Sequence, residues 1–441
     1  MARLSQYTHI TPINEGFIYY NSARGSDSML VLKTNYKEKS LNDAASEEIM
    51  LLHEHGHIVN NAEEDYETIR AIQNRFDNQD YLSLVILPNE ECNFRCVYCY
   101  ETMKHRVMNE STQDSILEFV KKNLPHYKSL QVAWFGGEPL LSVPTIEKMS
   151  QAFIQICHEL KKSFIASITT NGYLLDLETF RILKKCHITH FQITIDGNKE
   201  IHDLQRPLHN GDGTFDRIIE NLKTIKENVK SHTFEIMLRT NCSKQHLNIF
   251  DLYLDELSQN FGNDPRFSIL LRPVMDWGGN RVNQYKEQMF SVENLRIFMQ
   301  IYMEAFQKKA LPKYAVTLEP LQGVCYAGYK NTFVFDSSGA YFRCTCDFDN
   351  KRDSKLGMIS ANGVIFTDRE RTRLWNSDIS NRREQCDTCE LLPLCLGDQC
   401  PGYRLIGHDS HGGCPFEKYL LDEHILLAWT SKSKVAKENT K

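Results

Sequence analysis

Three closely spaced cysteines are the most chemically distinctive feature of the chain. Cys92, Cys96 and Cys99 lie in the segment Cys-Asn-Phe-Arg-Cys-Val-Tyr-Cys. Thiolates at this spacing can bind one iron–sulfur cluster from a single loop. A cubane cluster has four corners, so one iron is left open for a small molecule. A zinc site is the alternative, although structural zinc takes four protein ligands and this segment supplies three.

A second group of cysteines lies near the C-terminus. Eight of the 14 cysteines fall between residues 325 and 414. Clustered cysteines in a reducing compartment are more often metal ligands than disulfides. The pair Cys386-x2-Cys389 also suits a zinc knuckle. The remaining cysteines stand alone and suit buried packing: Cys157, Cys186 and Cys242.

Alternating strands and helices from residue 82 would position the first cysteine group. We expect strands at 83–87, 131–135, 164–169, 190–195, 233–240 and 267–272, and helices at 111–124, 145–161, 177–185, 214–228, 246–258 and 293–308. Such repeats form parallel strands with right-handed crossovers. The prediction is an α/β fold, a partial (β/α)6 TIM-like barrel, with its chemistry at the carboxyl ends of the strands. Ser111 is the expected N-cap of the first helix.

The flanking segments predict further domains. Residues 1–80 suit a small α+β domain, with strands at FIYYNS and MLVLKT and helices at 42–53 and 65–78. We expect the barrel at 81–310 and a cysteine-rich domain at 311–430. That domain would contain the hairpin TFVFD-SSG-AYFRC. The polar tail at 431–441 is expected to be disordered.

Composition excludes several classes of protein. The 441 residues include 51 Lys+Arg and 57 Asp+Glu, for a net charge of −6, and 41% are hydrophobic. The modest negative charge argues against a dedicated nucleic-acid binder. No apolar run approaches the roughly 18 residues of a membrane-spanning helix, and the start lacks a secretory signal. We therefore expect a cytoplasmic protein without nucleic-acid or membrane partners.

The cysteine triad, with Tyr98 before its last cysteine, resembles the signature of radical S-adenosylmethionine (SAM) enzymes. In that family the open iron of a [4Fe–4S] cluster binds SAM, and reduction cleaves SAM to a 5′-deoxyadenosyl radical. The resemblance implies that Cys92, Cys96 and Cys99 hold this catalytic cluster. Motifs at later strand ends resemble the family's SAM-contacting positions: Gly136-Gly137-Glu138-Pro139, Thr170-Asn171, Asp196, Arg206 and Arg239.

The C-terminal cysteines resemble the SPASM extension of peptide-modifying radical SAM enzymes. This resemblance implies two auxiliary [4Fe–4S] clusters, and three clusters in all. The first would use Cys325, Cys344 and Cys400, with Cys346 or an open site in the fourth position. The second would use Cys386, Cys389, Cys395 and Cys414. Four residues precede Cys400 where the family usually has three. Asp347 resembles an acid that serves as a base in sulfatase-maturing relatives.

Together these resemblances imply a maturase of ribosomally made, post-translationally modified peptides (RiPPs). Such an enzyme would abstract a hydrogen from a precursor peptide and install a thioether or carbon–carbon cross-link. The N-terminal domain would bind the leader sequence, and flavodoxin or ferredoxin would supply the electron. The alternatives are an anaerobic sulfatase-maturing enzyme that forms formylglycine, a peptide epimerase, and a zinc-knuckle interaction protein.

Overall fold

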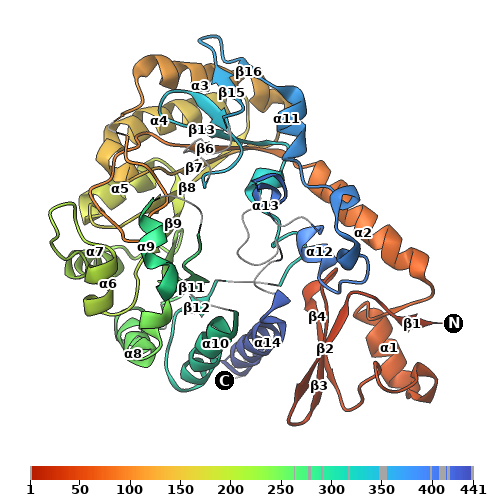
Figure 1. The fold of residues 1–441 in the computed structure, drawn as a ribbon. Helices are drawn as coiled ribbons and strands as arrows, with labels where there is room; N and C mark the ends of the chain where they lie inside the picture. Colours follow the sequence, from red (N-terminus) through yellow and green to blue (C-terminus); the bar gives the residue numbers. More distant parts are fainter. Residues whose placement is uncertain are drawn as a thin grey trace. The chain divides into compact units, whose positions relative to one another are not determined.

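The computed structural model describes residues 2–104, 106–262, 264–276, 280–289, 292–315, 318–346, 355–397, 400–406, 414 and 418–438. The chain falls into two compact units (Figure 1). The barrel unit comprises Asp80–Ala315 and Asn331–Leu374, and the composite unit joins Met1–Gln79, Val316–Lys330 and Trp375–Lys441. This division differs from the continuous domains 1–80, 81–310 and 311–430 expected from the sequence.

One sheet organises the barrel unit. Its strand order in the described residues is β12-β11-β10-β9-β8-β7-β6-β13-β14-β15-β16. The strands are β6 (Tyr81–Ile86), β7 (Ser129–Trp134), β8 (Ser163–Thr170), β9 (Ile188–Thr194), β10 (Glu235–Cys242), β11 (Phe267–Pro273), β12 (Lys313–Tyr314), β13 (Thr332–Phe335), β14 (Ala340–Phe342), β15 (Gly357–Ile359) and β16 (Ile365–Thr367). All neighbours from β12 to β13 pair in parallel. The expected strands correspond to β6–β11, which confirms the predicted α/β partial barrel.

Helices cover the outer side of this curved sheet (Figure 1). They are α3 (Glu110–Asn123), α4 (Val143–Glu159), α5 (Leu177–Lys185), α6 (Lys199–Gln205), α7 (Phe215–Asn228), α8 (Phe250–Phe261), α9 (Asn280–Tyr285), α10 (Val292–Lys308) and α11 (Arg369–Leu374). The predicted cap of α3 was wrong. The side chain of Asn109, rather than Ser111, accepts a hydrogen bond from the Thr112 N–H at 2.8 Å. The isolated Cys157, Cys186 and Cys242 are buried, as predicted.

The predicted hairpin exists as β13 and β14, but it belongs to the barrel sheet. Strand β13 pairs in parallel with β6 and in antiparallel orientation with β14. Its aromatic side chains pack against α3, with the Phe119 ring 4.9 Å from that of Phe333 and 5.6 Å from that of Phe335. Burial of these aromatic rings explains why the hairpin lies on the barrel sheet.

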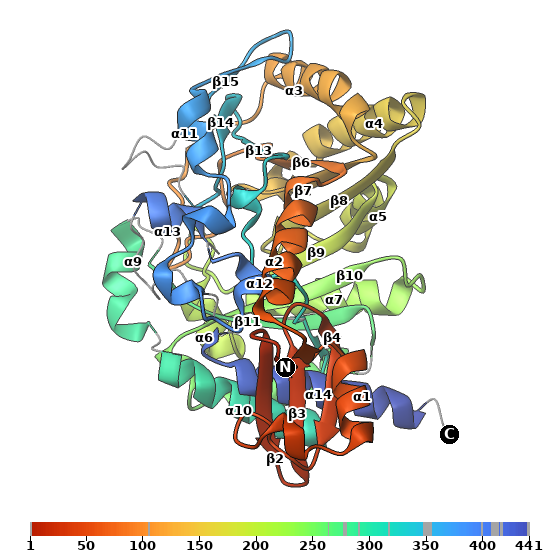
Figure 2. The same ribbon diagram turned by 90° about the vertical axis from the view of Figure 1, so that its right-hand side faces the viewer.

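The composite unit combines the N-terminal residues with the end of the chain. Its elements are β1 (Arg3–Leu4), β2 (Thr8–Ile13), β3 (Gly16–Asn21), β4 (Gly25–Leu32), β5 (Ile58–Val59), α1 (Ser46–Glu54), α2 (Ala62–Asp77), α12 (Leu392–Cys395), α13 (Pro401–Ile406) and α14 (Leu421–Glu438). Strands β2, β3 and β4 form an antiparallel sheet (Figure 2). One face packs against Leu52 of α1, and the other packs against Leu421 and Ile425 of α14. The sheet therefore depends on residues from both ends of the chain.

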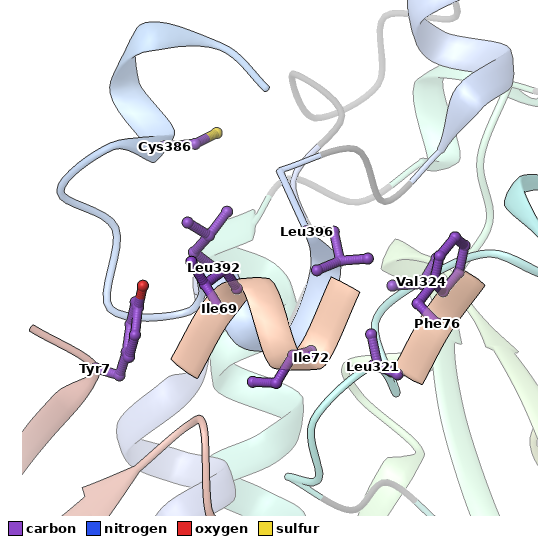
Figure 3. Close-up of a cluster of buried hydrophobic side chains, with 9 residues drawn as sticks. All are labelled: Tyr7, Ile69, Ile72, Phe76, Leu321, Val324, Cys386, Leu392 and Leu396. Carbon is purple, nitrogen blue, oxygen red and sulfur yellow. The ribbon is translucent and has the colours of Figure 1, made fainter. Parts of the chain in front are cut away.

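Helix α2 joins the same two parts of the sequence. Ile69, Ile72 and Phe76 share one face of the helix and pack with Leu392 and Leu396 of the C-terminal segment (Figure 3). Residues 1–79 thus lack a separate core. The tail also differs from the expected disorder, because α14 continues to Glu438; residues 439–441 lie outside the described part. None of the described helices is both long and apolar enough to cross a membrane.

Candidate active site

The cysteine triad lies in the loop that follows β6, at the carboxyl end of the strand. The chain after α6 holds this loop through two backbone hydrogen bonds. The Arg95 N–H donates to the Pro207 carbonyl at 2.8 Å, and the Val97 N–H donates to the Gln205 carbonyl at 2.9 Å. The triad is therefore anchored on the barrel at the edge where parallel-strand enzymes place their chemistry.

A buried ion-pair cluster fixes the base of the triad loop. Arg106 donates from Nε to Oε2 of Glu90 at 2.7 Å and from Nη2 to Oδ2 of Asp336 at 3.1 Å. The Ser337 hydroxyl also donates to Glu90. Sequence reasoning missed this cluster because Asp336 and Ser337 lie on the distant β13–β14 turn, and no local motif marks them. The cluster ties the triad loop to the hairpin added beside β6.

The two glycines after β7 let that chain approach the triad loop. A Cβ atom at Gly136, whose φ is +117°, would lie 2.4 Å from the Asn89 carbonyl oxygen. A Cβ atom at Gly137 would lie 2.3 Å from the Glu91 carbonyl oxygen and 3.2 Å from Cβ of Cys92. Neither position can take a side chain without moving the loop. This close contact with the triad loop is a structural reason for the glycines, beside their predicted contact with SAM.

Glu138 connects three loops at the strand ends. Its buried carboxylate accepts hydrogen bonds from the Thr170 hydroxyl at 2.6 Å, the Asn171 N–H at 2.7 Å and the Leu140 N–H at 3.0 Å. Burial raises the pKa of Glu138, and these hydrogen bonds oppose the shift. Asn171 in turn donates to the side chain of Asn93 in the triad loop at 2.8 Å. Glu138 thus positions the SAM-site loops, and the adjacent Pro139 begins a buried 3₁₀ turn.

Tyr98 is the centre of a polar network. Its hydroxyl donates to buried Asp196 and accepts hydrogen bonds from Arg206 at 2.9 Å and from Asn241 at 3.1 Å. Asp196 also accepts the Asn241 N–H at 2.7 Å. The network joins the triad loop to the ends of β9 and β10. Buried Nε of Arg206 has no hydrogen-bond partner among the described residues, so this guanidinium retains a donor for a ligand.

Arg239 and two further cysteines lie in the same unit. Nε of Arg239 donates to Asn241 at 2.9 Å. The Cys346 N–H donates to the sulfur of Cys344 at 3.3 Å. A hydrogen bond from Cys344 lowers the pKa of Cys346, and Tyr100 and Arg239 lower it further. Cys344 and Cys346 are thus barrel-unit residues associated with the chain beside the triad.

The predicted first auxiliary set draws on both units. Cys344 and Cys346 belong to the barrel unit, whereas Cys325 and Cys400 belong to the composite unit. The assembly of these four residues around one cluster stays a prediction. The expected base, Asp347, lies outside the described residues.

The burial of the triad thiols fits a metal centre. Burial raises the pKa of Cys92 and Cys96 and raises that of Cys99 to about 12. Metal ligands must be thiolates, so a strongly cationic partner is needed to stabilise all three here. Arg281 of α9 favours the charged forms of Cys96 and Cys99. Its buried Nη1 has no partner among the described residues, and no sequence pattern had marked it.

The predicted second auxiliary set comes together in the composite unit. Cys386, Cys389, Cys395 and Cys414 line one cavity of about 280 Å³, counted with its open mouth. All four are free thiols. Within the described residues, no group of three or more Cys, His, Asp or Glu side chains is placed to hold a single metal ion. Four thiols arranged around a cavity suit a polynuclear iron–sulfur cluster better than zinc.

The family of the chain follows from its sequence over the barrel. Residues 86–252, which include the triad loop and the ends of β7, β8, β9 and β10, match the sequence model of the radical SAM superfamily. The protein is a radical SAM enzyme. The cofactors of radical SAM enzymes are a [4Fe–4S] cluster and SAM, and the buried thiols and strand-end donors described above fit both.

Curated relatives of this radical SAM enzyme carry out different chemistry. It is 22% identical to a cysteine-type anaerobic sulfatase-maturating enzyme of Clostridium novyi over 345 residues, which are 71% of this chain and 86% of the relative. It is 27% identical to Fe-coproporphyrin III synthase of Methanosarcina barkeri over 346 residues, 70% of this chain and 80% of the relative. The comparisons therefore leave the substrate open.

Two solved structures share the fold of this radical SAM enzyme. Native anSMEcpe with bound AdoMet and Kp18Cys peptide matches with a TM-score of 0.58 and 20% identity, over 81% of this chain and 99% of that chain. Streptococcus suis SuiB bound to precursor peptide SuiA matches with a TM-score of 0.50 and 16% identity, over 95% of this chain and 99% of that chain. The fold of the described chain is therefore that of these SAM-dependent proteins.

Proposed function

We propose that this radical SAM enzyme is a RiPP maturase, which removes a hydrogen from a precursor peptide and installs a thioether or carbon–carbon cross-link. The observation that carries the proposal is the presence of two cysteine sites in one chain. The triad suits the SAM-binding cluster, and the cavity lined by Cys386, Cys389, Cys395 and Cys414 suits an auxiliary cluster. Two redox centres are what a net oxidation of the substrate requires.

The likeness to SuiB supports a precursor peptide as the substrate. SuiB was solved with its precursor peptide, and its fold matches 95% of this chain, whereas that of anSMEcpe matches 81%. The larger share extends to parts of the chain that the sulfatase-maturing fold does not match. This difference favours an enzyme with an added recognition region over a minimal sulfatase-maturing enzyme.

The cross-linking reaction balances with these components. The reduced cluster and SAM together supply a 5′-deoxyadenosyl radical, which takes one hydrogen atom from the peptide and becomes 5′-deoxyadenosine. Formation of the carbon–sulfur bond from a peptide thiol releases one proton and one electron. The auxiliary site takes up that electron, so SAM and the dithiol-free product account for a two-electron oxidation. An external donor such as flavodoxin or ferredoxin starts the cycle. The chain's own task is to orient the peptide and exclude water.

The leader sequence of the peptide would bind the β2–β3–β4 sheet by strand addition. The first half of β4 is already engaged: the Ser26 N–H donates to Glu319 at 3.0 Å, and the Ser28 carbonyl lies 2.8 Å from Nε2 of His57. We therefore place the peptide along the Leu30–Leu32 end of β4. N-methylation of successive peptide amides should weaken binding at alternate positions, because alternate strand amides face the partner strand. Equal effects at all positions would exclude strand addition.

Formylglycine formation is the second candidate function. The match to the C. novyi sulfatase-maturating enzyme, over 86% of that relative, favours it. A cysteine side chain would then be oxidised to an aldehyde, with loss of its sulfur. The two products are distinguishable, because a cross-link keeps the sulfur and removes two hydrogen atoms from the peptide.

Mass spectrometry of the reaction product tests the proposal. The reconstituted enzyme, SAM and dithionite would be incubated with a synthetic peptide encoded beside the gene, and in parallel with a sulfatase-derived cysteine peptide. We expect 5′-deoxyadenosine and loss of two hydrogens from the first peptide only, whereas an aldehyde on the second peptide would favour sulfatase maturation. Unchanged mass with solvent deuterium incorporation would indicate an epimerase. Metal analysis provides the control: three clusters predict about 12 irons per chain and little zinc, and mostly zinc would support an interaction protein.

A further inference from the structure

Two cations lie against one corner of the four-cysteine cavity in the composite unit. Nη2 of Arg383 lies 3.3 Å from the sulfur of Cys414, and Nζ of Lys418 lies 3.7 Å from the same sulfur. Both side chains line the cavity together with the four cysteines. A thiolate ligand at Cys414 would therefore carry two charge-assisted hydrogen bonds.

Backbone donors surround the other side of the cavity. The Leu391 N–H hydrogen-bonds to Cys389, and the Gly397 N–H hydrogen-bonds to Cys395. Hydrogen bonds to cluster sulfurs are among the features that set the reduction potential of an iron–sulfur centre. Because reduction adds a negative charge, donors and cations beside the ligands stabilise the reduced state more than the oxidised state.

The acidic neighbour of the cavity is neutralised by the N-terminal sheet. Glu390 follows Cys389 directly, and its Oε2 lies 2.5 Å from Nδ1 of His9 on β2. Its other oxygen pairs with Lys37. These contacts offset the carboxylate charge beside Cys389, so the field of Arg383 and Lys418 at the cavity is not cancelled by Glu390.

We propose that Arg383 and Lys418 are positioning residues that raise the reduction potential of the auxiliary cluster and thereby make it the electron acceptor of the reaction. The inference rests on the proposed function, in which Cys386, Cys389, Cys395 and Cys414 hold that cluster. The electron accepted is the one released when the peptide radical forms its new bond, and the proton leaves to solvent. With a higher potential, this transfer is downhill, and back-transfer to the peptide is disfavoured.

A redox titration of the full-length chain tests the inference. Alanine in place of all three triad cysteines removes the overlapping signal, and electron paramagnetic resonance then follows the auxiliary signal during reduction. Arg383→Gln and Lys418→Gln should each shift the midpoint to more negative potential, and the double variant should shift it further. Lys418→Arg should restore it. Lys432→Gln is the matched control, because Lys432 belongs to the same unit but pairs with Asp27 at 3.3 Å, and it should leave the midpoint unchanged.

The outcomes separate the inference from the function on which it rests. Full iron content with an unchanged midpoint in the double variant would overturn the role of the two cations. Loss of auxiliary iron in the Gln variants, with thermal unfolding unchanged, would also overturn it, because the cations would then retain the cluster rather than tune it. If Cys386→Ala leaves the iron content unchanged, the cluster assignment itself fails. A fall in iron in Cys386→Ala, with no shift in the Gln variants, leaves the proposed function standing.

Discussion

Alanine at Gly137 is expected to empty the triad site while sparing the rest of the molecule. The added Cβ would lie 2.3 Å from the carbonyl oxygen of Glu91 and 3.2 Å from Cβ of Cys92. Ordinary contact at this point begins near 3.4 Å, so the triad loop must move by roughly 1 Å. Overpacking of this kind costs about 1–3 kcal/mol, and a displacement of about 1 Å in an active site can reduce the rate about 10²-fold.

Iron analysis and SAM cleavage measure this effect separately. Gly137→Ala should lose the iron of one cluster and most of its 5′-deoxyadenosine formation, while the four-cysteine cavity keeps its share of iron. Gly211→Ala is the control: its φ is +92° and no atom lies within 4 Å of the added Cβ. It therefore bears only the backbone cost of about 1–2 kcal/mol. Normal iron and normal SAM cleavage in Gly137→Ala would refute the reasoning that links this glycine to the triad.

Other changes have equally definite expected results. Cys92→Ala should abolish SAM cleavage and remove about four irons per chain, whereas Cys157→Ala, a buried cysteine of α4, should keep both; retained cleavage in the first would exclude the triad assignment. Tyr98→Phe should weaken SAM binding by about 1–2 kcal/mol, because three polar partners lose its hydroxyl; an unchanged calorimetric Kd would contradict this. Burial alone would lower the pKa of His9, but Asp422 and Glu390 raise it to about 9. Its stabilising contribution should be complete below about pH 6.5 and disappear as the pH rises through 9, so the Tm difference from His9→Gln should shrink there; a constant difference would be inconsistent with it. Deletion of residues 1–79 should lower the iron content as well as peptide binding, since α2 packs on the cysteine-bearing segment; a full iron count would show that the segment folds without them.

The sequence identified the triad and the barrel strands because both are local patterns. Spacing alone placed Cys92, Cys96 and Cys99 in one loop, and alternating apolar runs marked β6–β11 to within a few residues. Strand β13 was also recognised, but its pairing with β6 was not, because partners such as Thr332 and Ser83 are far apart in sequence. A hairpin motif states that two strands pair and says nothing of the sheet they join.

Long-range polar contacts were beyond the sequence for the same reason. The salt-bridge cluster of Glu90, Arg106 and Asp336 combines common residues with no fixed spacing. The separate N-terminal domain was expected because residues 1–80 contain a plausible set of strands and helices. Their apolar faces, however, find their partners only in α12 and α14. Amphipathic patterns predict that a face is buried, but they do not name the segment that covers it.

The divided composition of the composite unit has a consequence for synthesis of the protein in the cell. Its first segment ends at Gln79 and its last begins at Trp375, with nearly the whole barrel unit translated between them. At ribosomal speeds of about 5–20 residues per second, the N-terminal segment waits about 15–60 s for its partner. During that interval the apolar faces of β3 and α2 are open to chaperones. The four cavity cysteines arrive last, so iron can be inserted there only after the nascent chain is nearly complete.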